Sequence, residues 1–196
     1  MPRENLLSFL QESMRLKRMV RSGWIYSGVP PADVESVADH SQFVTLITIL
    51  ICFDEQQKGK KINFEKALIM ATIHDLSESV SQDIDRRVRK FSPEKYDAFK
   101  HEMDRNALNT LLEKLPQITG EKLQALFKEF QEKKTIEARI VREADRLETI
   151  LQMNNYARNG FSEKMFSEFI LNFKQEIENY EFNFVKKIAK EILEEK

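Results

Sequence analysis

Residues 71–78, which read ATIHDLSE, place three ionisable side chains on one side of an otherwise apolar helix. At about 100° of rotation per residue, Glu78 falls between His74 and Asp75, as the i+4 neighbour of the first and the i+3 neighbour of the second. The small Ala71 shares this side and leaves space above the helix. We interpret this stretch as a site whose three polar groups bind a metal or move protons.

The composition favours one helical domain. The chain has 196 residues, of which 41% are hydrophobic and 32% charged, with only five glycines and five prolines. This length suffices for one sizeable core, and the sequence has no internal repeat and no strand pattern of any length. We therefore predict an all-α fold, a single-domain bundle of about six to eight helices over residues 1–196, in which 161–196 form C-terminal packing helices.

Charge and cysteine usage argue against several classes of protein. The 31 Lys and Arg residues nearly cancel the 32 Asp and Glu residues, which argues against a protein that coats nucleic acid. Cys52, the one cysteine, lies in an apolar run and is expected to be a reduced core thiol. The N-terminus lacks the apolar stretch of a signal peptide, and no run reaches the roughly 18 apolar residues of a membrane span. We expect a cytoplasmic protein that acts neither on nucleic acid polymers nor at a membrane.

The N-terminal part is predicted to contain one helix and one loop. The helix covers about residues 3–20, and its buried side carries Leu6, Leu7, Leu10, Met14 and Val20. Two glycines and two prolines mark residues 21–31 as a loop. This loop holds Trp24, the only tryptophan, close to Arg21. One interpretation is a tryptophan that pins the loop to the core, and the other is a clamp that binds phosphate with the Arg and a sugar or base with the Trp.

Capping residues delimit the next two helices. Ser36 is the predicted N-cap of the second helix. That helix is apolar nearly all round from 43 to 53, as expected for a buried central helix. Asn63 is predicted to cap the third helix, which carries residues 71–78 and ends near Ser79.

The second half of the chain contains further predicted helices. Ser92 and Pro93 form a helix start, and this helix continues to Leu115. Another helix follows Gly120, and Thr135 opens the next one.

Two other charged features have a structural and a functional interpretation. The basic run 86–90, RRVRK, is usually a solvated face, although one of its members could reach an anionic substrate. His101, which lies between charged neighbours, is expected on the surface.

Two carboxylates lie on the apolar stripe of the helix that Thr135 opens. Asp145 stands at the margin of this stripe and Glu148 nearer its middle. Burying an unpaired charge is costly, so both need partners. Arg139, Arg142 or Arg146 could supply a structural ion pair, and a metal could do so instead.

Four candidate metal ligands come from three helices. They are His40 on the second helix, His74 and Asp75 on the third, and Asp145 on the sixth. Two imidazoles and two carboxylates can close around one divalent cation and leave positions open for water, as a catalytic site requires. Ligands without thiolate suit Mn, Co, Fe, Zn, Ni or Mg. A metal there lowers the pKa of bound water and neutralises phosphoryl charge, and Glu78 is placed to orient or deprotonate that water.

The order of these four candidate ligands along the chain is a more specific signal of function than any one of them alone. Together with RSGW at 21–24, ESVADHS at 35–41, HDLSE at 74–78 and EADRLE at 143–148, it resembles the HD-domain phosphohydrolase superfamily, and within it the branch of 5′-deoxynucleotidases. The resemblance covers roughly residues 15–160.

The resemblance implies an HD-domain fold, in which the four candidate ligands bind the metal and Glu78 assists the water. It implies that Arg21 and Trp24 contact the phosphate and sugar of the nucleotide. It also implies that Asp83 is a substrate-binding and catalytic residue that lies beside the deoxyribose and disfavours a 2′-hydroxyl. The family often has Gly where Gln82 stands, a departure in the turn that leads to Asp83. A homodimer is implied as well.

We therefore hypothesise a metal-dependent hydrolase that releases inorganic phosphate from deoxyribonucleoside 5′-monophosphates. Because His40 and His74 must be neutral to bind metal, activity is expected to fall below about pH 6. One alternative is a hydrolase of the same superfamily that acts on a cyclic nucleotide, a guanosine polyphosphate or a triphosphate, with cations from the run 86–90. The other is a non-catalytic, metal-stabilised scaffold whose acidic and basic residues are only salt-bridged.

Overall fold

The computed structural model describes residues 3–194, and this part of the chain is built from helices. It contains ten α-helices and no strand, apart from one isolated antiparallel bridge between Val20 and Ser36. Two of the α-helices, α2 and α5, are a single turn each. The eight longer ones agree with the predicted all-α bundle of six to eight helices.

The α-helices are α1 (Arg3–Ser13), α2 (Ser22–Tyr26), α3 (Val37–Gln57), α4 (Phe64–Ile73), α5 (Glu78–Ser81), α6 (Pro93–Leu112), α7 (Gln117–Glu132), α8 (Ile136–Arg158), α9 (Ser167–Glu176) and α10 (Asn183–Glu194). The 3₁₀-helices are η1 (Met14–Lys17), η2 (Arg86–Phe91), η3 (Glu163–Phe166) and η4 (Ile177–Asn179).

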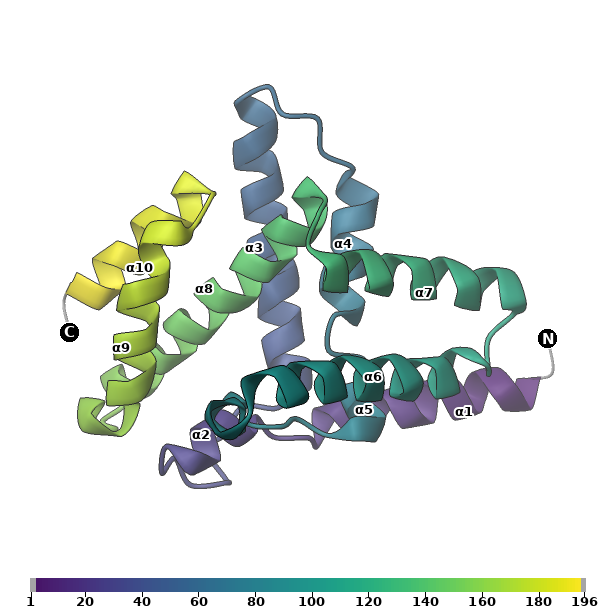
Figure 1. Ribbon diagram of the computed structural model, residues 1–196, viewed down its shortest axis with the longest axis horizontal. Helices are drawn as coiled ribbons and strands as arrows, with labels where there is room; N and C mark the ends of the chain where they lie inside the picture. Colours follow the sequence, from purple (N-terminus) through teal and green to yellow (C-terminus); the bar gives the residue numbers. More distant parts are fainter. Residues whose placement is uncertain (1–2, 195–196) are drawn as a thin grey trace.

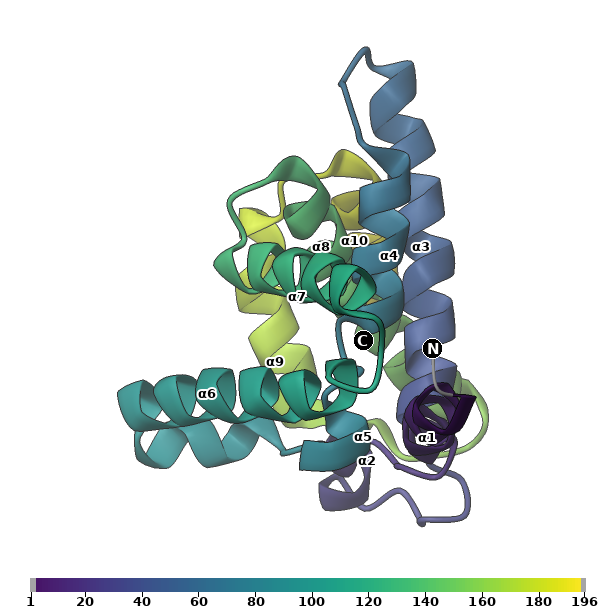
Figure 2. The ribbon, with the colours of Figure 1, turned by 90° about the vertical axis from the view of Figure 1, so that its right-hand side faces the viewer.

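The long helix α3 lies at the centre of the bundle. It packs along α4 and crosses α8, and α10 packs against α8 and also contacts α3 (Figures 1 and 2). The side chains between these helices form the larger apolar cluster, which includes Ile51, Met70, Ile150 and Val185. The C-terminal helices therefore contribute to the same core as α3, and they hold α8 against it.

The predicted capping residues start three of these helices. Ser36 and Asp39 form a capping box at α3, in which the Ser36 hydroxyl accepts from the Asp39 N–H and the Asp39 carboxylate accepts from the Ser36 N–H. Asn63 and Thr135 accept the corresponding N–H groups of α4 and α8. These caps fix where α3 and α8 begin, and hence which of their residues face each other.

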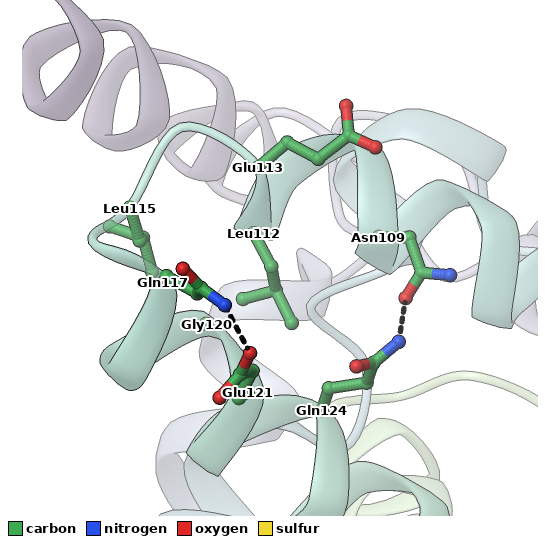
Figure 3. Close-up of a pocket in the computed structure, with 8 residues that line it drawn as sticks. All are labelled: Asn109, Leu112, Glu113, Leu115, Gln117, Gly120, Glu121 and Gln124. Carbon is green, nitrogen blue, oxygen red and sulfur yellow. Dashed lines mark hydrogen bonds between the residues drawn. The ribbon is translucent and has the colours of Figure 1, made fainter.

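The helices α6 and α7 form an antiparallel hairpin beside α4 (Figure 2). The helix that was expected after Gly120 instead begins at Gln117, so that Gly120 lies in its first turn. A Cβ added at Gly120 would stand 3.1 Å from the Leu112 carbonyl oxygen. The glycine therefore allows the two helices to approach closely, and it is not a helix boundary (Figure 3). The helix before it, predicted to reach Leu115, ends at Leu112.

The helix α3 is, within residues 3–194, the one segment long and apolar enough to cross a membrane, with a mean hydropathy of 1.3. In the fold it packs against α4 and α8, and it buries the polar side chains of His40 and Thr48. These contacts explain its apolar character as that of a core helix.

The N-terminal helix differs from the prediction in length and in orientation. The α-helix ends at Ser13, and a 3₁₀ turn replaces its expected last part. Leu7, Leu10 and Met14, which were expected to be buried, are about half exposed, and Leu16 of the 3₁₀ turn is buried instead. Periodicity located the apolar side of this helix correctly, but within this chain that side meets no core.

The third predicted helix is interrupted at the His-Asp pair. It ends at Ile73, four turn residues follow, and α5 starts at Glu78. The chain keeps its right-handed course, because Leu76, Glu78 and Ser79 donate to carbonyls three residues earlier. The tighter i+3 bonding replaces the α-helical pattern at the two predicted ligands.

The turn after α5 holds a side chain in a backbone conformation that suits glycine. Gln82 has φ 69° and ψ 159°, a region that residues with a Cβ rarely adopt. Where the resembling family often has glycine, this chain thus keeps the turn geometry with a glutamine. The turn leads directly to Asp83.

Replacing Gln82 with glycine should stabilise the protein. Gln82→Gly removes about 1–3 kcal/mol of backbone strain and adds less than about 1 kcal/mol of unfolded-state entropy. We expect the free energy of unfolding, measured by urea titration, to rise by about 1 kcal/mol. Gln11→Gly, at an exposed position in α1, should lower it by up to about 1 kcal/mol. If Gln82→Gly and Gln11→Gly lowered the free energy of unfolding by the same amount, the turn at Gln82 would not be strained.

Candidate active site

The structure brings the four predicted metal ligands to one point between α3, the turn after α4, and α8. The Nε2 atom of His40 lies 3.2 Å from Asp145 Oδ1 and 3.5 Å from Asp75 Oδ2. His74 Nε2 lies 3.2 Å from the same Asp75 oxygen and 3.4 Å from His40 Nε2. Ligand atoms of His40, His74 and Asp145 all fall within 4.8 Å of one another.

Both imidazoles are held through the nitrogen that faces away from this point. His74 Nδ1 donates to the Ala71 carbonyl at 2.8 Å. His40 Nδ1 contacts the Glu148 carboxylate, which is buried beside it. With Nδ1 engaged, each ring directs Nε2 and its lone pair at the other ligands, as in metal sites where an outer carboxylate or carbonyl fixes the tautomer.

The sequence left the partners of Asp145 and Glu148 open between an arginine and a metal. The structure pairs both carboxylates with His40. Two of the three arginines considered are engaged elsewhere, because Arg146 pairs with Glu176 and Arg139 with Glu181. Glu148, whose role was not predicted, therefore orients a ligand.

Strong electrostatic coupling marks the cluster. Burial and the Arg21 charge lower the pKa of His40, but contacts with Asp145 and Glu148 outweigh them and raise it to about 10. Burial raises the pKa of Asp75, but the neighbouring His74 holds it well below its usual range. The pKa of Asp145 is likewise lowered, against its burial, by the contact with His40. In the absence of a cation, a protonated His40 imidazole thus offsets part of the negative charge of the carboxylates.

The donor set fits a divalent cation. Two imidazole nitrogens and two carboxylate oxygens converge without a thiolate, which is the set that Mn, Co, Fe, Zn or Ni accept. A second group of possible ligands, formed by Glu35, His40 and Glu148, lies on the Nδ1 side of the same imidazole. Since Nδ1 of His40 already contacts Glu148, this second group orients His40 for the first group and is not a separate metal site.

Glu78 is buried next to the ligand cluster. Its side chain is 6% exposed, and burial with the charges of Asp75 and Asp83 raises its pKa well above the usual value. One oxygen, Oε1, lies 3.2 Å from Lys100 Nζ on α6. Within residues 3–194 the other oxygen, Oε2, has no hydrogen-bond partner.

A short antiparallel bridge places Arg21 at the cluster. The Arg21 N–H donates to the Glu35 carbonyl at 3.1 Å, and the Val37 N–H donates to the Met19 carbonyl at 2.7 Å. The segment before α2 is thereby fixed to the start of α3. The Arg21 guanidinium then reaches Asp75 at 3.5 Å.

Trp24 has the first of the two roles that the sequence allowed, that of a residue that pins the loop to the core. It is 1% exposed, its Nε1 donates to Glu35 Oε1 at 2.8 Å, and its ring packs against Tyr156 and Phe169. It therefore pins α2 to the core. It also lines the cavity next to Arg21.

Asp83 connects the strained turn with α2. Its Oδ2 accepts from the Ser22 N–H at 2.6 Å and from the Ser22 hydroxyl at 3.0 Å. Two residues later, Asp85 binds Arg87, whose Nη2 donates to the Gly23 carbonyl at 2.8 Å. The turn and the basic run are thus tied to the helix that carries Trp24.

A cavity of about 510 Å³ opens over the cluster and is lined by all of the predicted substrate-contacting residues. Arg21, Trp24, Asp75, Glu78, Asp83 and Asp145 lie in its walls, with the cations of the run 86–90. The helix α9 supplies a further wall through Phe169, Asn172 and Glu176. No chemistry was expected from this C-terminal part, because its apolar spacing is that of a packing helix. The polar signal that could have found it is the recurrence of Glu168, Asn172 and Glu176 at intervals of one turn.

A second cavity, of about 390 Å³, lies where α6 turns into α7 (Figure 3). Its polar groups are paired with one another, Gln124 with Asn109 and Gln117 with Glu121, both at 2.8 Å. It holds no cluster of ionisable groups comparable to the first. His101, on the same helix α6, is exposed as predicted.

Comparison with known proteins gives a consistent result. The family model described as HD domain matches residues 13–186. A 5′-deoxynucleotidase of Schizosaccharomyces pombe is 32% identical over 169 residues, which cover 84% of this chain and 79% of that protein. A 5′-deoxynucleotidase of Dictyostelium discoideum is 31% identical over 158 residues, which cover 79% of this chain and 78% of that protein.

Solved structures share the fold. A conserved hypothetical protein from Pyrococcus furiosus aligns with a TM-score of 0.74 and 33% identity, covering 96% of this chain and 97% of that one. An HD-domain phosphohydrolase from Listeria innocua aligns with a TM-score of 0.73 and 20% identity, covering 97% of this chain and 88% of that one. The latter supports the fold alone.

Metal binding should release protons and weaken as the pH falls. Because the pKa of His40 is raised to about 10 in the metal-free protein, a cation at neutral pH must displace a proton from its imidazole. For each proton that the metal displaces, the apparent metal affinity falls about tenfold for every unit by which the pH is lowered. We expect this slope in Mn²⁺ titration calorimetry between pH 6 and 8, with proton release measured in buffers of different ionisation enthalpy. An affinity that is independent of pH would contradict the assignment of His40 as a ligand.

Proposed function

The chain belongs to the HD domain family, and on that premise we propose that it is a metal-dependent 5′-deoxynucleotidase. It would release inorganic phosphate from deoxyribonucleoside 5′-monophosphates. The observation that carries the proposal is the convergence of His40, His74, Asp75 and Asp145 beside a cavity large enough for a nucleotide, which Asp75 and Asp145 line. The 5′-deoxynucleotidases to which the chain is similar support the substrate class.

The four convergent side chains would hold one divalent ion, for which Co or Mn is our first choice. When bound, this ion supplies a Lewis acid that polarises a phosphoryl oxygen and acidifies a water. Glu148 and the Ala71 carbonyl keep the two imidazoles aimed at it.

The chain's own groups position the substrate and move the proton. Arg21, held beside Asp75, is a fixed cation for the phosphoryl oxygens. Glu78 has an oxygen with no partner in residues 3–194 and is buried beside the cluster, so it is placed to accept a proton from the attacking water. The nucleoside 5′-oxygen then leaves in line with that attack.

We place the sugar between Trp24 and Asp83. Both line the cavity, and Asp83 Oδ2 is fixed by Ser22. A carboxylate held in this way beside the sugar would occupy the space that an added 2′-hydroxyl needs. The strained Gln82 backbone keeps Asp83 in this turn.

A triphosphate substrate is less well supported. Such a substrate needs additional free cations around the phosphate chain. In the run 86–90, Arg87 is engaged by Asp85 and Arg89 by Asp97. This leaves Arg86 and Lys90 of the run for a phosphate chain, since both line the cavity.

The activity is tested by phosphate release from a panel of nucleotides. With Co²⁺ or Mn²⁺, we expect hydrolysis of deoxyribonucleoside 5′-monophosphates to exceed that of ribonucleotides, cyclic nucleotides and triphosphates. Asp145→Ala should lose at least about 100-fold of the activity, because a ligand is removed. Glu143→Ala, on the same helix but bonded to the Glu181 and Phe182 N–H groups, is the control and should retain it.

Two results would contradict this assignment. If the metal-loaded protein hydrolyses none of the nucleotides, the 5′-deoxynucleotidase proposal is wrong. If bound metal is present and Asp145→Ala retains full activity, the ligand set is wrong and a scaffold role gains support.

We also propose that the protein is a homodimer that buries the outer face of α3. Phe43, Leu46, Leu50 and Phe53 are each 44–55% exposed on this face. Their 3-4-3 spacing is that of a heptad seam, which packs well against an identical helix. The formal net charge of −1 opposes such an association little.

The dimer is tested by the mass in sedimentation analysis. Wild type should have twice the chain mass, and Leu50→Lys should have the chain mass with unchanged helicity, because a charge cannot be buried unpaired in the seam. Ile118→Lys, on α7 at 82% exposure, should remain dimeric. A monomeric wild type, or a dimeric Leu50→Lys, would rule out this face.

A further inference from the structure

The helix α6 contributes a lysine to a partly buried ion pair in the wall of the cavity. Neither member of this pair is one of the four candidate metal ligands. Lys100 Nζ lies 3.2 Å from Glu78 Oε1 and 2.9 Å from Asp104 Oδ1, one turn further along α6. The Lys100 side chain is 22% exposed, and it lines the cavity together with Glu78.

The two oxygens of Glu78 are in different situations. Oε1 faces the lysine ammonium, whereas Oε2 is buried and has no partner among the described residues. A purely structural buried carboxylate is normally satisfied at both oxygens, because an unmet acceptor is costly. The asymmetry therefore indicates that one oxygen is held and the other is kept available.

Glu78 stands at the start of a short helical segment that α6 contacts at both ends. It begins α5, a helix of four residues that follows the turn 74–77 and ends at the strained Gln82. Asp104 also lies 3.5 Å from the Ser81 hydroxyl at the other end of α5. Lys100 and Asp104 thus contact both ends of this short helix from the longer and straighter α6.

We propose that Lys100, fixed by Asp104, is the positioning residue of Glu78: it binds Oε1 and so directs Oε2 into the cavity, toward the water that attacks the phosphoryl group. This inference deepens the proposed phosphohydrolase activity and rests on it. Lys100 itself makes no contact with the reacting atoms.

The experiment compares Lys100→Met and Lys100→Arg with a matched control. Lys114→Met is that control, because Lys114 pairs with Glu12 at a similar exposure of 23% and does not line the cavity. We expect Lys100→Met to lower kcat by about 10- to 100-fold, as for other residues that orient a catalytic group, with KM changed less than about threefold. Lys100→Arg should recover part of kcat, and Lys114→Met should leave it unchanged.

A double-mutant cycle separates positioning from substrate binding. In a Glu78→Gln background, Lys100→Met should lower kcat no further, because the group that the lysine positions is already altered. A rise in KM, or an equal loss of kcat in that background, would overturn the proposal and assign Lys100 to direct substrate binding.

A readout without turnover completes the test. In urea unfolding of the metal-free protein, the combined effect of Glu78→Gln and Lys100→Met should be smaller than the sum of the two, while Mn²⁺ affinity stays within about threefold of wild type. Additive effects on stability would show that the pair is not coupled, and would overturn the proposal. If wild type hydrolyses no nucleotide, the proposed function fails, whereas a silent Lys100→Met in an active enzyme refutes only this inference.

Discussion

The close approach of acidic groups around His40 is the constraint on which the structure depends. Asp145 and Glu148 contact opposite nitrogens of this one imidazole, and Asp75 lies 3.5 Å from it. Carboxylates so close together repel one another unless positive charge lies between them. A protonated imidazole supplies that charge, and a divalent ion supplies more of it. The capping box of α3 and the Thr135 cap of α8 serve this arrangement, because a shift of either helix by one residue would turn these side chains away from one another.

The convergence of the candidate ligands could be predicted because each stands on or directly after a helix with a recognisable start. His40 and Asp145 lie on helices whose caps and apolar stripes are legible from residue types alone, and the His-Asp pair directly follows α4. The break after Ile73 could not be predicted in this way. An i+3 turn and an α-helix need nearly the same side chains, and the bond of the His74 side chain to the Ala71 carbonyl that accompanies the break is visible only in the structure. The expectation of Glu78 close to the pair survived, because both geometries carry it around to the same side.

The remaining parts of the site depend on contacts between distant segments, which leave little signal in one sequence. In the sequence, Lys100 is one of many charged residues of an amphipathic helix. Its contact with Glu78, the first residue of α5, is visible only in the structure. In α9, Phe169 has the spacing of a core residue, and it is partly buried against the core, where it packs on Trp24. It lines the cavity as well. The burial of the apolar side of α1 was predicted wrongly for a related reason. Periodicity shows which side of a helix is apolar, but it does not show whether another segment covers that side.

The wall that α9 provides bears on how the protein comes into being on the ribosome. All four ligands have been synthesised once Asp145 has been added, so a growing chain can in principle gather them before it is finished. The chamber above them lacks one side until Glu176 has followed. During translation, the segments that carry the ion-binding groups therefore precede the segment that encloses a nucleotide, which follows Asp145 by up to 31 residues.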